Sequence, residues 1–301
     1  MKNIKKYIFF GFCITMFFHS CNNSKSENLI NNFKSTGIIQ KVEPPNWWVG
    51  METNNLQVMV YGDEINSLLP VIENPNVKLE SFEQVENSNY LFLNISIFNN
   101  AKPDSVKINF YKNDTLLDRY IFTLNERENN AKYVEGFNNS DVMYLITPDR
   151  YANGDTSNDD IKEMFERPNR ENNRGIHGGD IQGIINHLDY IKDLGFTTIW
   201  LNPVLENNMR KSSYHGYSTT DYYKVDPRFG SNELFKELSQ RAKENGIKLV
   251  MDLIPNHCGS EHWFFKDPPM KNWFNNQSGF KQTSHRRETI QDLYASQIDK
   301  K

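Results

Sequence analysis

The sequence predicts a mixed fold of two domains, an antiparallel β-sandwich followed by a parallel β-α-β-α-β unit. Short alternating apolar runs recur from about residue 56 to residue 124 without helical spacing. From residue 141 onward, short and continuously apolar strands alternate with amphipathic helices, as in parallel sheets with crossover helices. The length of 301 residues, 38% of them hydrophobic, accommodates about two domains.

The first 20 residues have the pattern of a secretory signal peptide. A lysine-rich start precedes an apolar run that ends at Phe18 and is too short to span a membrane. Ser20 stands directly before Cys21, which resembles a bacterial lipoprotein box. We expect lipidation of Cys21 and a tether over residues 21–34, and thus a secreted lipoprotein anchored to a membrane, in the periplasm or at the outer membrane of a diderm bacterium. The alternative is an ordinary signal peptide followed by a chance cysteine.

The charge argues against a general nucleic-acid binder, which normally presents a basic face. The chain has 34 Lys and Arg against 38 Asp and Glu, a net charge of −4. Removal of the first 20 residues takes away three lysines and leaves 31 against 38, a net charge of −7. Cys258 would then be the remaining cysteine besides the lipidated one, so we expect no intramolecular disulfide.

The β-sandwich is predicted over residues 35–125. Turn-forming residues at Gly62-Asp63 and Lys112-Asn113-Asp114 separate its strands. A polar stretch over residues 126–140 predicts a linker. The predicted strands span residues 56–61, 90–98, 107–111 and 119–124, and the first of them alternates well.

The β/α part is predicted over residues 141–257. Gly195 ends the first helix, while Ser231 opens the second and Gly246 lies at its end. Long polar loops follow the first two strands at their C-terminal ends, where (β/α) barrels place their chemistry. The predicted strands span residues 141–146, 196–201 and 247–254, and the predicted helices span residues 180–194 and 231–246.

Polar and aromatic residues after the second and third of these strands predict a sugar-binding edge. An aromatic ring suits the apolar face of a pyranose, and an imidazole suits its hydroxyls. Each residue alone has a plainer interpretation, since a single His or Asp is usually structural. Together, residues 252–257 resemble the first signature region of the α-amylase family of glycoside hydrolases, and residues 214–222 and 226–230 resemble the family's stretch after strand two. The resemblance implies sugar stacking by Tyr217, hydrogen bonds to sugar hydroxyls from His215 and His257, and a site-organising role for Asp252 and Asn256.

The loop over residues 148–159 carries oxygen donors around a glycine, which suits Ca²⁺. A solvated Asn/Asp turn is the plainer alternative. The loop resembles the calcium loop of neopullulanases and cyclomaltodextrinases. That resemblance implies a Ca²⁺ site with ligands Asn153, Asp155, Asn158, Asp159, Gly178 and Asp180.

The N-terminal domain resembles the immunoglobulin-like β-sandwich that precedes the barrel in the same enzymes, over residues 43–62. The resemblance implies that the following strands are the first three β/α units of a TIM (β/α)8 barrel. It also implies a homodimer through the N-terminal domain in the intact parent. The tandem Trp47 and Trp48 could bind glucan, but packing of their rings against the sheet is the interpretation we favour.

The barrel is expected to be incomplete. Retaining hydrolysis needs two carboxyl groups about 5–5.5 Å apart, and in this family they follow strands four and five. Residues 141–257 account for three strands and residues 258–301 for the start of the loop domain after strand three, against about 250 residues for a whole barrel. We therefore assign no catalytic residue.

Two functions follow from the sequence. The chain is expected to be the N-terminal portion of an α-glucan hydrolase that acts on α-1,4 links of cyclodextrins, pullulan or maltooligosaccharides, and to be inactive alone. The alternative is a non-catalytic glucan-binding lipoprotein, and a second polypeptide that supplies the other half is a third interpretation.

Overall fold

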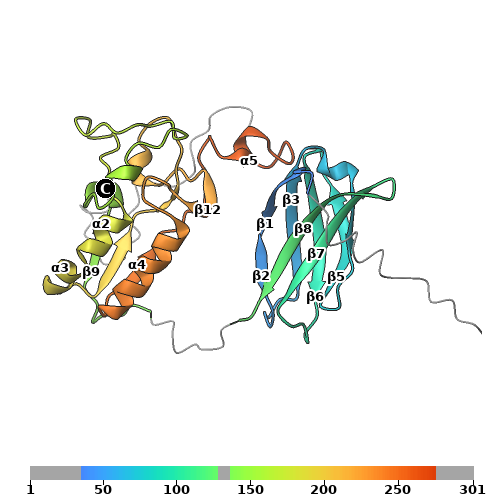
Figure 1. Cartoon of the computed structure of the whole chain (residues 1–301), viewed down its shortest axis with the longest axis horizontal. Coiled ribbons are helices and arrows are strands. Elements are labelled where there is room, and N and C mark those ends of the chain that lie inside the picture. Colours follow the sequence, from blue (N-terminus) through green and yellow to red (C-terminus); the bar gives the residue numbers. More distant parts are fainter. Residues whose placement is uncertain (1–34, 128–135, 276–301) are drawn as a thin grey trace, which may run out of the picture.

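A computed structural model describes residues 35–127 and 136–275. The sandwich runs from blue to green in Figure 1 and the β/α part from yellow-green to red. The predicted signal peptide, the predicted tether up to residue 34 and Cys21 lie outside the described residues, as do residues 128–135 of the predicted linker and 276–301 of the predicted loop domain. In the two described ranges, no helix has the length and apolar character needed to cross a membrane.

The N-terminal domain is a sandwich of two four-stranded sheets, which confirms the predicted fold class. One sheet has the order β1-β3-β6-β5 and the other the order β2-β8-β7-β4. All neighbouring strands are antiparallel except β2 and β8. The strands are β1 (Ile39–Glu43), β2 (Asn46–Trp48), β3 (Asn55–Gly62), β4 (Leu69–Ile72), β5 (Val77–Gln84), β6 (Tyr90–Ile97), β7 (Asp104–Lys112) and β8 (Thr115–Asn125), with a 3-10 turn η1 (Ile65–Ser67) after β3.

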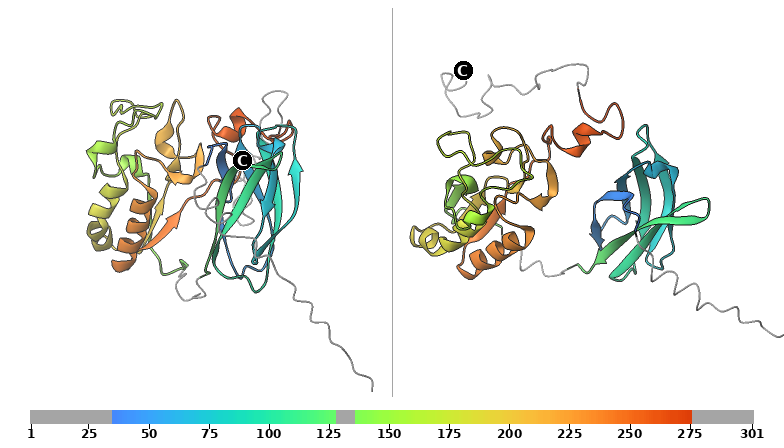
Figure 2. Two further views of the ribbon diagram at one scale, coloured as in Figure 1. Left: turned by 45° about the vertical axis from the view of Figure 1, so that its right-hand side comes forward. Right: turned by 45° about the horizontal axis from the view of Figure 1, so that its top comes forward.

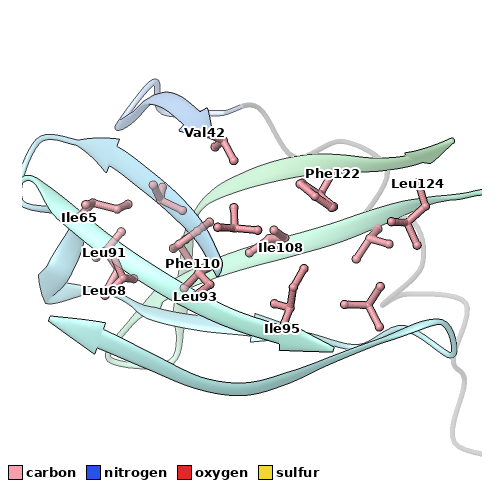
Figure 3. Close-up of a cluster of buried hydrophobic side chains, with 14 of the residues drawn as sticks. Val42, Ile65, Leu68, Leu91, Leu93, Ile95, Ile108, Phe110, Phe122 and Leu124 are labelled. Atoms are coloured by element: carbon pink, nitrogen blue, oxygen red, sulfur yellow. The ribbon is translucent and has the colours of Figure 1, made fainter. Parts of the chain in front are cut away.

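The sandwich core lies between the two sheets, where alternate residues of each strand meet (Figure 3). Side chains on one face of a strand point the same way at every second position, so the alternating pattern determines which residues are buried. Leu93 of β6 and Phe110 of β7 are fully buried. Each such apolar side chain contributes about 1.5–3 kcal/mol through its burial.

The second domain contains a three-stranded parallel sheet with the order β13-β10-β9, the start of the predicted barrel. The pairing is in register, with Ile146, Leu201 and Met251 side by side. The helices pack against one face of this sheet and bury a core that includes Ile199 and Leu238. The elements are β9 (Met143–Ile146), α2 (Ile181–Asn186), α3 (Leu188–Asp193), β10 (Thr198–Leu201), α4 (Asn232–Glu244) and β13 (Lys248–Met251). A two-stranded antiparallel sheet of β11 (Leu205–Glu206) and β12 (Asp221–Val225) lies in the loop after β10.

The structure differs from the sequence in the first helix, which was expected as one element over residues 180–194. It consists of α2 and α3, separated at His187, whose backbone leaves the helical region with φ −118° and ψ 16°. The His187 ring places Nδ1 2.7 Å from the carbonyl oxygen of Gly183, so it bonds to the preceding turn. Asp180 caps α2 and Ser231 caps α4 by accepting bonds from backbone N–H groups of the first turn.

Candidate functional site

The three residues predicted to bind sugar and the two predicted to organise the site come together at one edge of the β/α part. Tyr217 follows a 3-10 turn, η5 (Ser213–His215), and Asp252, Asn256 and His257 lie in the segment just after β13. Gly216 joins His215 to Tyr217 with φ 78°, a conformation that favours glycine. A side chain at this position would also collide with the carbonyl oxygen of Pro203.

Hydrogen bonds hold this edge in place. The Tyr217 hydroxyl donates to Oδ2 of Asp252 at 3.0 Å, and the backbone N–H of Tyr217 donates to Nδ1 of His215 at 2.9 Å. Nε2 of His257 lies 2.9 Å from the Tyr217 carbonyl oxygen. A carbonyl oxygen only accepts, so Nε2 carries the proton in this contact. We call the group of Tyr217, His215, His257, Asp252 and Asn256 the lip.

Burial shifts the pKa of two side chains of the lip, His215 and Tyr217. Burial lowers the pKa of His215, although nearby Glu166 acts in the opposite direction, so the ring is neutral near pH 7. Burial raises the pKa of Tyr217, with a further contribution from its bond to Asp252. The Tyr217 side chain is still 38% exposed, so its ring is open to a ligand. A neutral aromatic surface with imidazole and carboxylate groups beside it has the chemistry of a sugar site.

An apolar pocket of about 310 Å³ lies beside His257. The Tyr222 hydroxyl, one of the groups lining it, donates to the carbonyl oxygens of His257 at 2.6 Å and Ile254 at 3.2 Å and so holds the segment after β13 against β12. Sequence reasoning did not single out Tyr222, although it belongs to the stretch that resembles the family. The pocket is lined by Tyr222, Leu253, Ile254, Pro255, Asn256, His257, Cys258, Phe264 and Phe274.

The predicted calcium ligands gather between the loop after β9 and the start of α2. We call Asn153, Asn158, Asp159, Gly178 and Asp180 the oxygen cluster. The Asn153 amide donates to Asp159 at 2.7 Å, and Gly178 packs so tightly there that a Cβ would collide with the Asp159 carboxylate. The buried Asp180 accepts from the backbone N–H of Gly154 at 3.1 Å. Asn158 is buried next to Asp180, with its amide nitrogen 3.5 Å from Oδ2.

Two oxygens of this cluster are buried without a hydrogen-bond partner, Oδ1 of Asn153 and Oδ1 of Asn158. A buried polar atom without a partner is costly and calls for an explanation. Asp155 differs from the other predicted ligands, because its carboxylate caps the 3-10 turn η4 (Thr156–Asn158) by accepting from Ser157. Where the chain is described, no three His, Cys, Asp or Glu side chains form a metal-binding group.

Sequence reasoning missed two charged pairs, one buried on both sides and one with a buried carboxylate and a partly exposed arginine. Asp226 and Arg228 are both buried and lie 2.8 Å apart, and Arg228 also donates to the carbonyl oxygen of Asn207 at 2.9 Å. Asp149 pairs with Arg150 and accepts from the backbone N–H of His177 at 2.9 Å. In the sequence, each pair is visible as an aspartate shortly before an arginine in a loop that follows a strand. The spacing is two positions for Asp226 and Arg228 and one position for Asp149 and Arg150. These pairs fix the loops that carry the lip and the oxygen cluster.

Comparison with known proteins agrees with this architecture. Residues 145–296 match the model of the α-amylase catalytic domain, and residues 41–128 match the model of the cyclomaltodextrinase N-terminal domain. The chain therefore belongs to the α-amylase family of glycoside hydrolases. Within that family it is of the cyclomaltodextrinase and neopullulanase type, which confirms the resemblance seen in the sequence.

Individual relatives share part of this chain. A cyclomaltodextrinase of Thermoanaerobacter pseudethanolicus is 43% identical over 128 residues, 42% of this chain and 21% of the relative. Neopullulanase 2 of Thermoactinomyces vulgaris is 37% identical over 127 residues, 42% of this chain and 21% of the relative. An Anoxybacillus α-amylase structure has 42% identity and a TM-score of 0.40, with 44% of this chain and 28% of that chain covered. The matched part thus spans about a fifth of the curated relatives' length.

Proposed function

We propose that this chain recognises α-glucan as part of a retaining glycosidase that acts on α-1,4 links of cyclodextrins, pullulan or maltooligosaccharides. The observation that carries the proposal is the lip. Tyr217, His215 and His257 lie side by side there, joined by hydrogen bonds that orient their rings. Tyr217 would stack on a glucose ring, and the two imidazoles would bond to its hydroxyls. Asp252 holds the Tyr217 hydroxyl and so orients the stacking ring.

We also propose that these 301 residues alone hydrolyse no α-glucan. Retaining chemistry needs a carboxylate nucleophile and a carboxylic acid about 5–5.5 Å apart. At the lip, the carboxylate of Asp252 is engaged by Tyr217, and a positioning role suits it better than either catalytic role. Release of reducing sugar from β-cyclodextrin, pullulan or starch by the purified chain would refute this part of the proposal.

Glucan recognition is tested by calorimetric titration with maltoheptaose, with cellohexaose as the β-linked control. We expect binding of maltoheptaose, little or no binding of cellohexaose, and an affinity about two- to tenfold lower in Tyr217→Ala, since stacking contributes about 0.5–1.5 kcal/mol beyond the buried area. Tyr190→Ala is the matched control, because Tyr190 is 56% exposed on α3. Equal binding of both sugars, or an unchanged affinity in Tyr217→Ala, would contradict the proposal.

We further propose a Ca²⁺ ion at the oxygen cluster. The unpartnered Oδ1 atoms of Asn153 and Asn158 support it, because a hard cation takes six to eight oxygen ligands and would satisfy both. Asp159 and Asp180 would supply charge, and the Gly178 carbonyl a further oxygen. Bound Ca²⁺ would tie the loop after β9 to the start of α2.

The calcium proposal is tested by thermal unfolding with excess Ca²⁺ and with a chelator. We expect a higher midpoint with Ca²⁺ in the unmodified chain and a smaller difference in Asp159→Asn, since a ligand that binds the folded state stabilises it. Asp193→Asn, at the exposed end of α3, is the control. Equal midpoints with and without chelator in the unmodified chain would refute the proposal.

Lipidation of Cys21 and a membrane-anchored location remain proposals that rest on the sequence pattern. Metabolic labelling with a fatty-acid analogue tests both, and we expect label in the membrane fraction that is lost in Cys21→Ser. A homodimer through the sandwich is a proposal for the intact parent, and sedimentation of a chain with the whole barrel would test it.

A further inference from the structure

At one end of the sheet that contains β3 and β6, both faces are apolar. Val58, Val60, Leu91 and Leu93 point into the sandwich core. The residues that alternate with them along the strands form a second cluster on the outer face, made of Met59, Tyr61, Tyr90 and Phe92. An outer face of a sandwich normally carries polar residues, so this outer cluster implies that something covers it.

The cover is the segment of the second domain that follows the lip. Its helix α5 (Trp263–Lys266) lies close to the sandwich in both Figure 1 and Figure 2. The Trp263 ring lies 4.6 Å from the Tyr61 ring and 5.7 Å from the Tyr90 ring, the latter nearly parallel at 11°. The Trp273 ring lies 6.4 Å from the Phe92 ring. The domain contact is therefore aromatic and specific in its geometry.

Asp267 lies at the centre of this contact. Its Oδ2 accepts from the Tyr61 hydroxyl at 3.0 Å and from the Asn89 amide at 2.8 Å, while Oδ1 accepts from the Asn87 amide. The Tyr90 hydroxyl donates to its carbonyl oxygen. Burial alone would raise the pKa of Asp267, but the bonds from Asn89, Asn87 and Tyr61 outweigh it and hold the pKa below its usual value. The carboxylate is thus charged and satisfied by donors from the sandwich.

A short path of contacts connects Asp267 to the lip, and it begins with the bond from the Asp267 backbone N–H to the Trp263 carbonyl oxygen at 2.9 Å. The His262 ring stacks on Trp263 at 5.7 Å and 25°, and it lies 5.5 Å from the Tyr222 ring. Tyr222 in turn donates to the carbonyl oxygen of His257 at 2.6 Å. Asp267 follows His257 by only ten positions in the chain. A segment of this length that is fixed at both ends has little freedom to move.

We propose that Asp267 is a positioning residue through which the sandwich holds the lip. The donors Tyr61, Asn87 and Asn89 fix Asp267, and the Trp263–His262–Tyr222 contacts pass that constraint to His257. The sandwich then acts as a structural part of the sugar-recognition edge. The link to sugar rests on the glucan recognition proposed above, whereas the link between the sandwich and the lip does not.

The test combines hydrogen exchange with sugar titration on the full chain. The variants are Asp267→Ala and, as a milder change, Tyr61→Phe, which removes one donor and keeps the ring. Asp193→Ala removes the same charge from the exposed end of α3 and is the control. Backbone exchange is followed at Gly259 and at Phe265 to Asp267, whose N–H groups are bonded in the structure, and maltoheptaose affinity is measured in parallel.

We expect Asp267→Ala to speed exchange at these positions at least about tenfold, to leave β10 and β7 unchanged, and to weaken maltoheptaose binding about fivefold or more. Tyr61→Phe should change both in the same direction by less, and Asp193→Ala should change neither. Unchanged exchange in Asp267→Ala, or faster exchange with full affinity, would overturn the proposal. If the unmodified chain binds no maltoheptaose, glucan recognition fails, and exchange alone then decides whether the sandwich holds the lip. If Asp267→Ala does not fold, Tyr61→Phe decides by the same criteria.

Discussion

Replacement of Glu43 by Gln should make the stability of the chain less dependent on pH. Glu43 ends β1 and lines a cavity of about 340 Å³ that also includes Arg119 and Tyr223 of β12. Next to it, Lys41 Nζ pairs with Asp221 Oδ2 at 3.1 Å. Burial raises the pKa of Glu43 from 4.5 to about 7, while Lys41 lowers it and Asp221 raises it further.

The size of the effect follows from linkage. Moving a pKa from 4.5 to about 7 corresponds to about 3.4 kcal/mol at about 1.36 kcal/mol per unit. Glu43 is only partly buried, so solvent screening reduces the expected contribution to about 1–2 kcal/mol. Because the pKa is higher in the folded state, the contribution is fully present below pH 4.5 and is lost as the pH rises through about 7.

Urea unfolding monitored by tryptophan fluorescence at pH 5 and pH 9 measures the pH-dependent part of the free energy of unfolding. From pH 5 to pH 9, the free energy of unfolding of the unmodified chain should fall by about 1–2 kcal/mol more than that of Glu43→Gln, because glutamine does not ionise. Glu52→Gln, an exposed acid in the turn after β2, should behave like the unmodified chain. Equal pH dependence in the unmodified chain and in Glu43→Gln would refute the reasoning, as would a loss of stability in the variant at pH 9.

Two further substitutions test the packing of each domain. Phe110→Ala should lower the free energy of unfolding by about 3–5 kcal/mol, since it empties a fully buried position of the sandwich core; a loss below about 1 kcal/mol in urea unfolding would contradict that assignment. Gly216→Ala should weaken maltoheptaose binding with little effect on the sandwich, because the backbone at φ 78° and the Pro203 carbonyl leave no room for a methyl group between His215 and Tyr217. An unchanged affinity in calorimetric titration would show that the lip tolerates the shift.

Much of the sandwich was predictable, because β3, β7 and β8 carry apolar alternation and β6 is almost continuously apolar over its first half. The strands that sequence patterns missed lie at sheet edges or are short. β5 is largely exposed and rich in charged residues, as edge strands often are. β4 contains a proline and β2 has only three residues. Their place in the sheets depends on partners distant in sequence, which local patterns do not encode.

The lip was predictable for a different reason. Its five residues lie in two short stretches, one after the second predicted strand of the β/α part and one at the end of the third, which the structure ends earlier, at Met251. The contacts of Asp267 were not predictable, since Asn89 is 178 positions away and neither residue stands out in its own stretch. The break of the first helix at His187 also went unseen, because apolar spacing continues through it. The contacts that could not be predicted are those between segments distant in the sequence.

The first four residues of β6 are buried on both faces of the strand. Leu91 and Leu93 lie in the sandwich core, and Tyr90 and Phe92 lie under the aromatic segment of the second domain. Part of the free energy that keeps the sandwich folded therefore comes from the neighbouring domain. Melting of the second domain would expose that face and lower the midpoint of the first, so the two should unfold with shared cooperativity. A ligand that stabilises one domain would then also be detectable as slower unfolding of the other.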